Sequence, residues 1–395
     1  MKNGALAGAR LCASRRLRLQ TRRRHHQPAE NKQDKESSHN DKGRKRRIFT
    51  PMTRPITIEE FLTLRGTIPV ADVRTPAEFT HGHIPGAVNL PLFTNEERVK
   101  VGTTYKQQGR EAAILLGFNL TGPKWSGFIH QALQIAPQKK IALHCWRGGM
   151  RSAAMAWALD LYGFEVQTIR GGYKSFRHWA HRQYQRTYPL SVIGGMTGSG
   201  KTRILTRLRA SGEQIIDLED LAQHQGSTYG SLNRLIQPTQ EQFENNLAIQ
   251  LARMDPNRPV WIEDESQNIG KCLIPKPLWT QLRAATLFDV QVPEQDRVAA
   301  LLAEYGNLDK DFLVESTERI GRPLGPEHTK AAVAAIREDR MADFIRLVLV
   351  YYDNTYRKCL VTRDPNNIIP ITAAGGDPER NGALLLSIAR NSIPV

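Results

Sequence analysis

Residues 191–202, with the sequence SVIGGMTGSGKT, decide the fold of the C-terminal part of the chain. Ser191 to Ile193 predict a buried strand, and residues 195–202 fit the pattern GxxxxGK[ST] just before a helix that begins at Lys201. In such a loop, successive backbone N–H groups surround a diphosphate and the lysine neutralises its charge. The hydroxyl of Thr202 can reach Mg²⁺. The stretch therefore predicts a phosphate-binding loop (P-loop) between a strand and a helix.

The residues expected to bind the diphosphate are Gly195, Gly198, Ser199, Gly200, Lys201 and Thr202. A later buried strand, Val260 to Ile262, ends next to Glu263 and Asp264, which are placed to bind or orient a metal ion. Mg²⁺ would then be held through Thr202 and Asp264, although a solvated strand end is the competing interpretation. Residues 217–222 lie where P-loop proteins often have a second strand and an active-site loop, but a surface turn fits their composition equally well.

A second functional loop, HCWRGGMRS at residues 144–152, lies nearer the N-terminus. Ile141 to His144 predict a strand, and Ser152 to Leu161 predict a buried helix. Loop N–H groups and the helix N-terminus would converge above the sulfur of Cys145 and form an anion-binding cradle. The positive helix end and the arginine charges lower the pKa of a thiol. We therefore expect Cys145 to be largely thiolate at neutral pH.

The anion loop is expected to consist of Arg147, Gly148, Gly149 and Arg151. The two glycines let the backbone curl without obstruction by side chains. A lone cysteine is commonly a small buried core residue, but two arginines and two glycines beside this one favour a reactive thiol. The spacing Cys-x5-Arg after a histidine also occurs in cysteine-dependent phosphatases, so the loop alone leaves phosphoester hydrolysis open.

Residues 72–79 (DVRTPAEF) and 81–89 (HGHIPGAVN), taken with the cysteine loop, resemble rhodanese domains. The resemblance covers about 55–180, and it implies a cysteine that carries a persulfide or an analogous chalcogen. Strands and helices alternate in both parts of the chain, which indicates parallel α/β architecture. The predicted fold is a rhodanese-like α/β domain (55–183) followed by a P-loop NTPase-like α/β domain (188–395) with a helical C-terminal part.

Residues 1–51 form a basic tail that holds 15 Lys and Arg against 4 Asp and Glu, whereas the rest of the chain holds 40 against 35. So polar a segment cannot bury enough apolar surface to fold alone, and we expect it to be disordered. A dispensable tail, a basic arm on RNA and a targeting peptide are the competing interpretations of its role. Residues 178–189 are expected to connect the domains, and residues 331–356 are expected to form a long helical stretch.

Composition excludes several classes of protein. The four cysteines lie far apart with no CxxC pair, which fits neither a disulfide framework nor a zinc site. No stretch approaches the roughly 18 uncharged apolar residues of a membrane span. We therefore expect a cytoplasmic protein with no membrane partner, in a reducing compartment where a lone thiol remains available for chemistry.

The order of the two domains resembles that of the tRNA 2-selenouridine synthases. Local segments that look like this family's are residues 145–152, 171–177, 195–202, 263–266 and 351–353. The resemblance implies replacement of the 2-thio group of a modified wobble uridine (position 34) in tRNA with selenium. Selenophosphate would be the selenium donor, and the sulfur would first be alkylated by geranyl diphosphate, a geranyltransferase activity. The resemblance gives Cys145 the role of an S-selanylcysteine intermediate, with tRNA as substrate and a selenophosphate-supplying enzyme as partner.

Two other functional classes stay open. One is a rhodanese-fold cysteine phosphatase or sulfurtransferase fused to a P-loop kinase or ATPase, which phosphate release from ATP would reveal. The other is a non-catalytic RNA-binding module, which is disfavoured because the chain beyond residue 51 carries a net charge of only +5.

Overall fold

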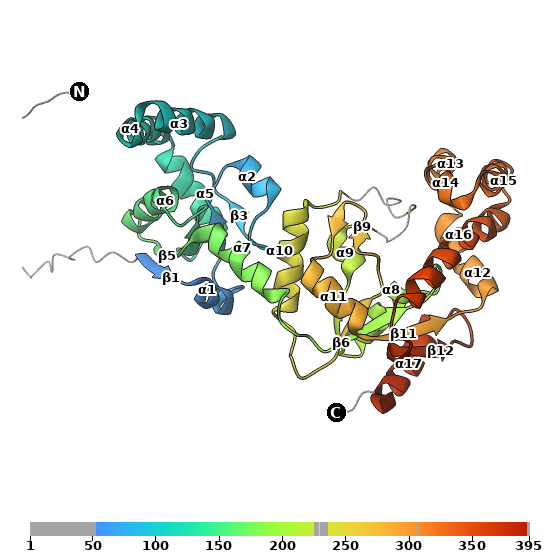
Figure 1. Cartoon of the computed structure of the whole chain (residues 1–395). Helices are drawn as coiled ribbons and strands as arrows, with labels where there is room; N and C mark the ends of the chain where they lie inside the picture. The colour runs from blue at the N-terminus through green and yellow to red at the C-terminus, as the bar shows by residue number, and fades with distance from the viewer. Residues whose placement is uncertain (1–52, 225–228, 230–235, 307, 393–395) are drawn as a thin grey trace, which may run out of the picture. The chain divides into compact units, whose positions relative to one another are not determined.

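A computed structural model describes residues 53–224, 229, 236–306 and 308–392. The predicted disordered tail, residues 1–51, lies outside the described residues. The described residues form two α/β domains, and Figure 1 labels their helices and strands.

The N-terminal domain is built on a five-stranded sheet whose paired strands are all parallel. Its strands, in spatial order, are β1 (Thr53–Ile56), β5 (Glu165–Ile169), β4 (Lys140–His144), β2 (Val70–Asp72) and β3 (Val88–Asn89). Strand β4 lies at the centre and is buried from Ile141 to His144. The carboxyl end of β4 leads directly into the cysteine loop, so a central, largely buried strand positions Cys145.

Helices alternate with these strands, as the sequence predicts. They are α1 (Ile58–Leu64), α2 (Pro76–His81), α3 (Asn95–Gln108), α4 (Arg110–Thr121), α5 (Trp125–Ile135), α6 (Met150–Leu161) and α7 (Gly172–Gln183). Helix α1 begins directly after Thr57. Thr57 and Glu60 form a capping box there, in which each side chain accepts a hydrogen bond from the other residue's backbone N–H.

The P-loop domain contains a second five-stranded sheet, again with only parallel pairs. In spatial order its strands are β12 (Ile368–Thr372), β11 (Thr286–Gln291), β6 (Leu190–Gly194), β8 (Val260–Glu263) and β7 (Gln214–Ile216). Because parallel strands end at the same edge of a sheet, the residues that follow β6, β7 and β8 meet there. That edge carries the P-loop.

Around this sheet lie α8 (Lys201–Ala210), α9 (Leu218–Ala222), α10 (Gln240–Leu251), α11 (Lys276–Ala284) and α17 (Pro378–Ser392), with an antiparallel pair of short strands, β9 (Asn268–Ile269) and β10 (Cys272–Leu273). The helical part between β11 and β12 consists of α12 (Glu294–Tyr305), α13 (Lys310–Arg319), α14 (Gly321–Leu324), α15 (Pro326–Arg337) and α16 (Met341–Val361). Its own apolar core is formed by residues from α12 to α16, among them Leu313, Ile336 and Phe344. The predicted α/β fold class, with a helical C-terminal part, is thus confirmed.

One expectation about an individual segment is corrected. Residues 331–356 form two helices rather than one, because the chain turns between α15 and α16 and Asp339 has a positive φ of 58°. The expected connector, residues 178–189, includes the end of α7, which runs to Gln183 and buries Trp179 and Ala180 in an apolar core.

Within the described part of the chain, none of the helices combines the length and the apolar character that crossing a membrane would require.

Candidate functional site

Cys145 follows β4 directly, and its side chain is buried with only 4% of its surface exposed. The sulfur accepts hydrogen bonds from the Gly149 N–H at 3.2 Å and from the Ser152 hydroxyl at 3.3 Å. Burial raises the pKa of the thiol, but the Ser152 hydroxyl and the backbone N–H groups of the loop lower it by more. The net pKa lies below the ordinary value, in the direction that the sequence predicts. The contacts responsible are hydrogen bonds to the sulfur.

The backbone of the cysteine loop is held in place by close packing. Gly148 has a φ of +65°, and a Cβ atom there would lie 2.8 Å from the Ile169 carbonyl oxygen, so glycine is required. The Cys145 and Trp146 carbonyls accept hydrogen bonds from the N–H groups of Tyr173 and Lys174, in the first turn of α7. The loop is therefore fixed on both sides, which leaves its N–H groups aimed at the sulfur.

The two arginines of the loop differ in their surroundings. Arg147 is exposed. Arg151 forms a two-point ion pair with Glu78 of α2, with N···O distances of 2.6 and 3.2 Å. The structure therefore connects Arg151 to α2, a contact that the spacing of the loop did not predict.

A buried ion pair lies beneath the loop. Arg74 contacts the Asp72 carboxylate at 2.6 Å, and both side chains are almost fully buried. The Arg74 guanidinium also lies over the ring of Tyr173, 3.9 Å from its centroid. Asp72 and Arg74 stand in the rhodanese-like segment of the sequence, but only the structure shows that they support the residues packed against the cysteine loop.

The P-loop connects β6 to α8, and α8 begins at Lys201 as predicted. The Lys201 ammonium donates a hydrogen bond to the Gly195 carbonyl at 3.3 Å. Burial lowers the pKa of Lys201, but the nearby carboxylates of Glu265 and Glu263 raise it by more. Gly198 has a φ of +84°, and a Cβ atom there would lie 2.9 Å from the Arg297 carbonyl oxygen. A charged lysine and a closely packed glycine loop thus lie together at the sheet edge.

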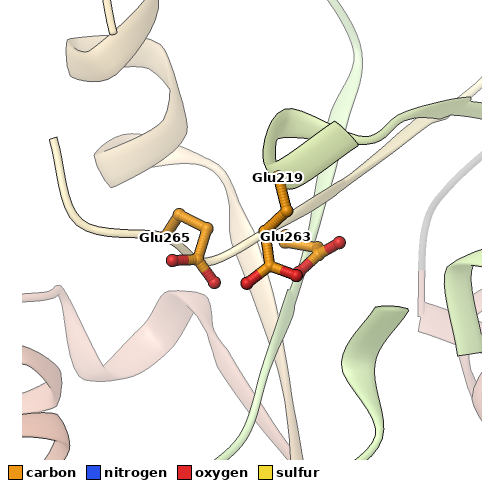
Figure 2. Close-up of side chains that lie close together, drawn as sticks. All are labelled: Glu219, Glu263 and Glu265. Carbon is orange, nitrogen blue, oxygen red and sulfur yellow. The ribbon is translucent and has the colours of Figure 1, made fainter. Parts of the chain in front are cut away.

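Three glutamates gather beside the P-loop (Figure 2). Glu219 lies on α9, Glu263 ends β8 and Glu265 follows two residues later. One carboxylate oxygen from each lies within 4.8 Å of those of the other two. The Thr202 hydroxyl lies 3.0 Å from Glu219 Oε2 and 3.5 Å from Glu263 Oε2. These three residues are called the glutamate cluster below.

The titration of the glutamate cluster is strongly perturbed. Burial and the neighbouring carboxylates raise the pKa of Glu263 well above its ordinary value. Burial also raises the pKa of Glu265, to about 8, although the Lys201 charge opposes this. Neighbouring groups that shift one another's pKa in this way are typical of functional sites.

Asp264, which the sequence predicts as a Mg²⁺ ligand, lies outside the glutamate cluster. Its Oδ1 atom accepts a hydrogen bond from the buried Arg363 guanidinium at 2.5 Å and lies 3.5 Å from Arg283. A carboxylate already paired with two arginines is a poor ligand for a cation. Glu263 keeps a place in the site. Glu219 and Glu265 were not predicted as site residues, although both closely follow a strand that ends at the P-loop edge.

The helical part contributes one further support of the P-loop. Arg297 of α12 donates a hydrogen bond to the Thr197 carbonyl at 3.1 Å. The same guanidinium forms two hydrogen bonds, both 2.8 Å long, to the carboxylate of Asp353 on α16. In the sequence, Asp353 stood out only through the resemblance of residues 351–353 to the family. The structure shows that its carboxylate pairs with Arg297.

Comparison with known protein families matches both domains. Residues 57–178 match the rhodanese-like domain, and residues 188–340 match the tRNA 2-selenouridine synthase AAA domain. A solved N-terminal domain of a putative ATP/GTP-binding protein from Clostridium difficile 630 covers 31% of the chain, and 96% of that domain is covered, at 40% identity. Its TM-score of 0.30 is too low to carry a structural argument.

Relatives named tRNA 2-selenouridine synthase match along most of the described chain. The protein from Nitrosomonas europaea is 40% identical over 60% of this chain, and 63% of its own length is covered, which is less than two thirds. The protein from Pseudomonas putida GB-1 is 35% identical over 71% of this chain, and 79% of its length is covered. The extent of this second match, together with both domain matches, shows that the chain belongs to the tRNA 2-selenouridine synthase family.

Proposed function

We propose that the protein is a tRNA-modifying enzyme that replaces the sulfur at C2 of a wobble 2-thiouridine with selenium. One observation carries the proposal: the same chain holds a thiol of lowered pKa in a glycine loop whose N–H groups face the sulfur, and a P-loop with a charged lysine. Membership of the tRNA 2-selenouridine synthase family gives this pair of sites its chemical meaning. The proposed substrates are tRNA, selenophosphate and geranyl diphosphate, in the cytoplasm, with a selenophosphate-supplying enzyme as partner.

The P-loop serves the first step of this proposal. The base sulfur attacks the C1 carbon of geranyl diphosphate, the C–O bond breaks, and diphosphate leaves with the electron pair. Backbone N–H groups from Gly195 to Gly200 and the Lys201 ammonium stabilise the negative charge that develops on the leaving group. The S-alkylated base can then lose its sulfur as a thiol, which is a better leaving group than the original thione sulfur.

The cysteine loop serves the second step. Its N–H groups and Arg147 bind the phosphate of selenophosphate, and Cys145 carries the selenium as S-selanylcysteine. Forming this S–Se bond from the thiolate breaks the Se–P bond, releases phosphate and passes two electrons to an oxidant of the disulfide class. A thiol of lowered pKa suits this role because the thiolate is the nucleophilic form. The selenium of S-selanylcysteine then attacks C2 of the uridine and expels the S-alkyl group as a thiol. Reduction of the S–Se bond by thiols finally releases 2-selenouridine and Cys145, and it returns the two electrons.

The two steps separate in a single assay of tRNA nucleosides by chromatography and mass analysis. Cys145→Ala removes the thiolate and leaves the P-loop unchanged, so S-geranyl-2-thiouridine should accumulate with no 2-selenouridine. The matched control is Cys359→Ala, since Cys359 is an exposed cysteine on α16. Normal 2-selenouridine formation by Cys145→Ala would show that selenophosphate reacts with the alkylated base directly.

Lys201→Ala tests the other site in the same assay. Without the charge that faces the diphosphate, we expect both geranylation and selenation to fall by about 100-fold or more. Arg209→Ala, an exposed change near the end of α8, is the control. Normal alkylation of tRNA by Lys201→Ala would assign the P-loop to another ligand. Release of phosphate from ATP that is lost in Lys201→Ala would favour the kinase alternative. Release of phosphate from a phosphoester that is lost in Cys145→Ala would favour the phosphatase alternative.

A further inference from the structure

The glutamate cluster brings three carboxylates together from separate segments of the P-loop domain. Glu219 reaches the site from α9, whereas Glu263 and Glu265 approach from the end of β8 and the loop after it (Figure 2). Their oxygens lie within 4.8 Å of one another. Two unit charges 4 Å apart repel by about 4 kcal/mol at the effective dielectric constant of a protein surface. Three ionised carboxylates are therefore unfavourable here unless a proton or a cation lies among them.

The surrounding side chains do not neutralise this charge fully. Among the residues that the structure describes, no Lys or Arg side chain forms an ion pair with Glu219, Glu263 or Glu265 at 4.0 Å or less. Lys201 is close enough to influence their titration, but its ammonium donates to the Gly195 carbonyl.

Glu263 gives an independent indication of a ligand. The residue is only 1% exposed, its carboxylate points into the glutamate cluster (Figure 2), and its Oε1 atom is buried with no hydrogen-bond partner. An unpartnered buried carboxylate oxygen costs several kcal/mol, and such oxygens are normally satisfied by a donor or a metal ion. The cluster thus contains an acceptor for which the protein supplies no donor.

We propose that Glu219, Glu263 and Glu265 form a binding site for a hard divalent cation, Mg²⁺ or Mn²⁺, that is occupied without any diphosphate. Three carboxylates at one point are the oxygen ligands that these cations prefer. The Thr202 hydroxyl, already within reach of two of the carboxylates, lies next to the site. Asp264 is outside it because Arg363 and Arg283 hold its carboxylate.

The number of protein ligands makes this proposal distinct from the usual use of a P-loop. There Mg²⁺ is held by one or two protein groups and by the phosphates of the ligand, so the metal arrives with the phosphate. Three glutamates supply enough negative charge to hold the cation before a diphosphate binds. The site would therefore be a permanent feature of this sheet edge, and it is independent of the reaction proposed above.

The test uses the full chain and Mn²⁺ alone, with no diphosphate, selenophosphate or tRNA. Binding is followed by electron paramagnetic resonance of free Mn²⁺ and by isothermal titration calorimetry. We expect one site in the unchanged protein. Loss of an outer hydrogen-bond partner of a metal ligand already weakens binding 10- to 100-fold, so Glu263→Gln and Glu265→Gln should each weaken Mn²⁺ binding by at least about tenfold.

The matched control is Asp220→Asn, because Asp220 is an exposed carboxylate on α9 next to Glu219 and outside the glutamate cluster. Thermal unfolding gives a second readout: Mn²⁺ should raise the Tm of the unchanged protein and of the control, but not of the Gln variants. In the presence of a metal chelator, Glu263→Gln should unfold at the same temperature as the unchanged protein or at a higher one. This result would show that the variant folds.

Three results would overturn the proposal. They are no Mn²⁺ binding by the unchanged protein, Mn²⁺ binding by both Gln variants that is as tight as in the unchanged protein, and Mn²⁺ binding only after inorganic diphosphate is added. The last would mean that the phosphates carry the metal. None of these results depends on whether the protein selenates tRNA, so failure of this proposal can be told apart from failure of the proposed function.

Discussion

The state of the Cys145 thiol results from two opposing effects on one sulfur atom. Burial favours the neutral thiol, whereas hydrogen bonds from the Ser152 hydroxyl and from loop N–H groups favour the thiolate. The hydrogen bonds dominate, so the pKa is lowered. A thiol that ionises below the usual pH range suits the selenium-handling role proposed for Cys145.

This balance predicts the pH dependence of thiolate formation. Because the pKa of Cys145 is lowered, thiolate absorbance in the ultraviolet should rise with a midpoint below pH 9.0, the ordinary value for a cysteine thiol. Ser152→Ala removes one donor to the sulfur and should move the midpoint upward.

The absorbance of Cys145→Ser is subtracted at each pH, which removes the contribution of the other cysteines to the titration. Ser126→Ala, an exposed change on α5, should leave the midpoint where it was. An unchanged midpoint in Ser152→Ala would assign the shift to the backbone alone.

At the scale of elements, helices α12 and α16 act as supports for the P-loop. The Arg297 guanidinium connects three segments, since it contacts the Thr197 carbonyl and both oxygens of Asp353. Arg297 is 4% exposed and Asp353 is 8% exposed, so this ion pair is largely shielded from water. A buried pair whose partner is removed leaves an uncompensated charge, which destabilises a protein far more than loss of a surface pair does.

Asp353→Ala should therefore lower the free energy of unfolding by about 3–5 kcal/mol. It should also weaken diphosphate binding, because Arg297 would no longer be fixed against the P-loop. The control is Glu315→Ala, which breaks the exposed pair with Arg319 on α13 and should cost less than about 1 kcal/mol. Urea unfolding of both variants measures the difference. Equal destabilisation by the two changes would contradict a structural role for the Arg297–Asp353 pair.

At the scale of the whole molecule, positive charge is concentrated at one end of the chain. Residues 1–51 carry a net charge of +11, out of +16 for the whole chain. The matches to known domain families begin only at residue 57, and both the cysteine loop and the P-loop follow that residue. The parts needed for the proposed chemistry are therefore found without the tail.

A protein that begins at Met52 should keep the rate of selenation of tRNA within about twofold of the full chain. The measurement is nucleoside analysis together with tRNA binding at several salt concentrations. If the tail contributed phosphate contacts, its removal would weaken binding and flatten the dependence of log K on log salt concentration. That result, in a truncated protein that remains folded, would make the tail a basic arm for RNA.

The sequence by itself determined the two loops and the α/β fold. Each loop is a continuous strand–loop–helix unit, so its conformation depends on neighbouring residues: glycines where φ must be positive, and a helix start at Met150 or Lys201. Local hydrogen bonds and steric limits act over a few residues, and a single stretch of sequence records them. The capped start of α1 is equally local, because Thr57 and Glu60 are only three residues apart.

Only the tertiary structure decided which side chains share a site. Glu219 and Glu263 meet because β7 and β8 are neighbours in the sheet, and Asp264 is excluded because Arg363, 99 positions away, pairs with it. The packing of α15 and α16 also imposed a turn at Asp339 that apolar periodicity did not reveal. Contacts between residues so far apart depend on strand order and on charge burial in the folded protein, and no local pattern in the chain specifies either.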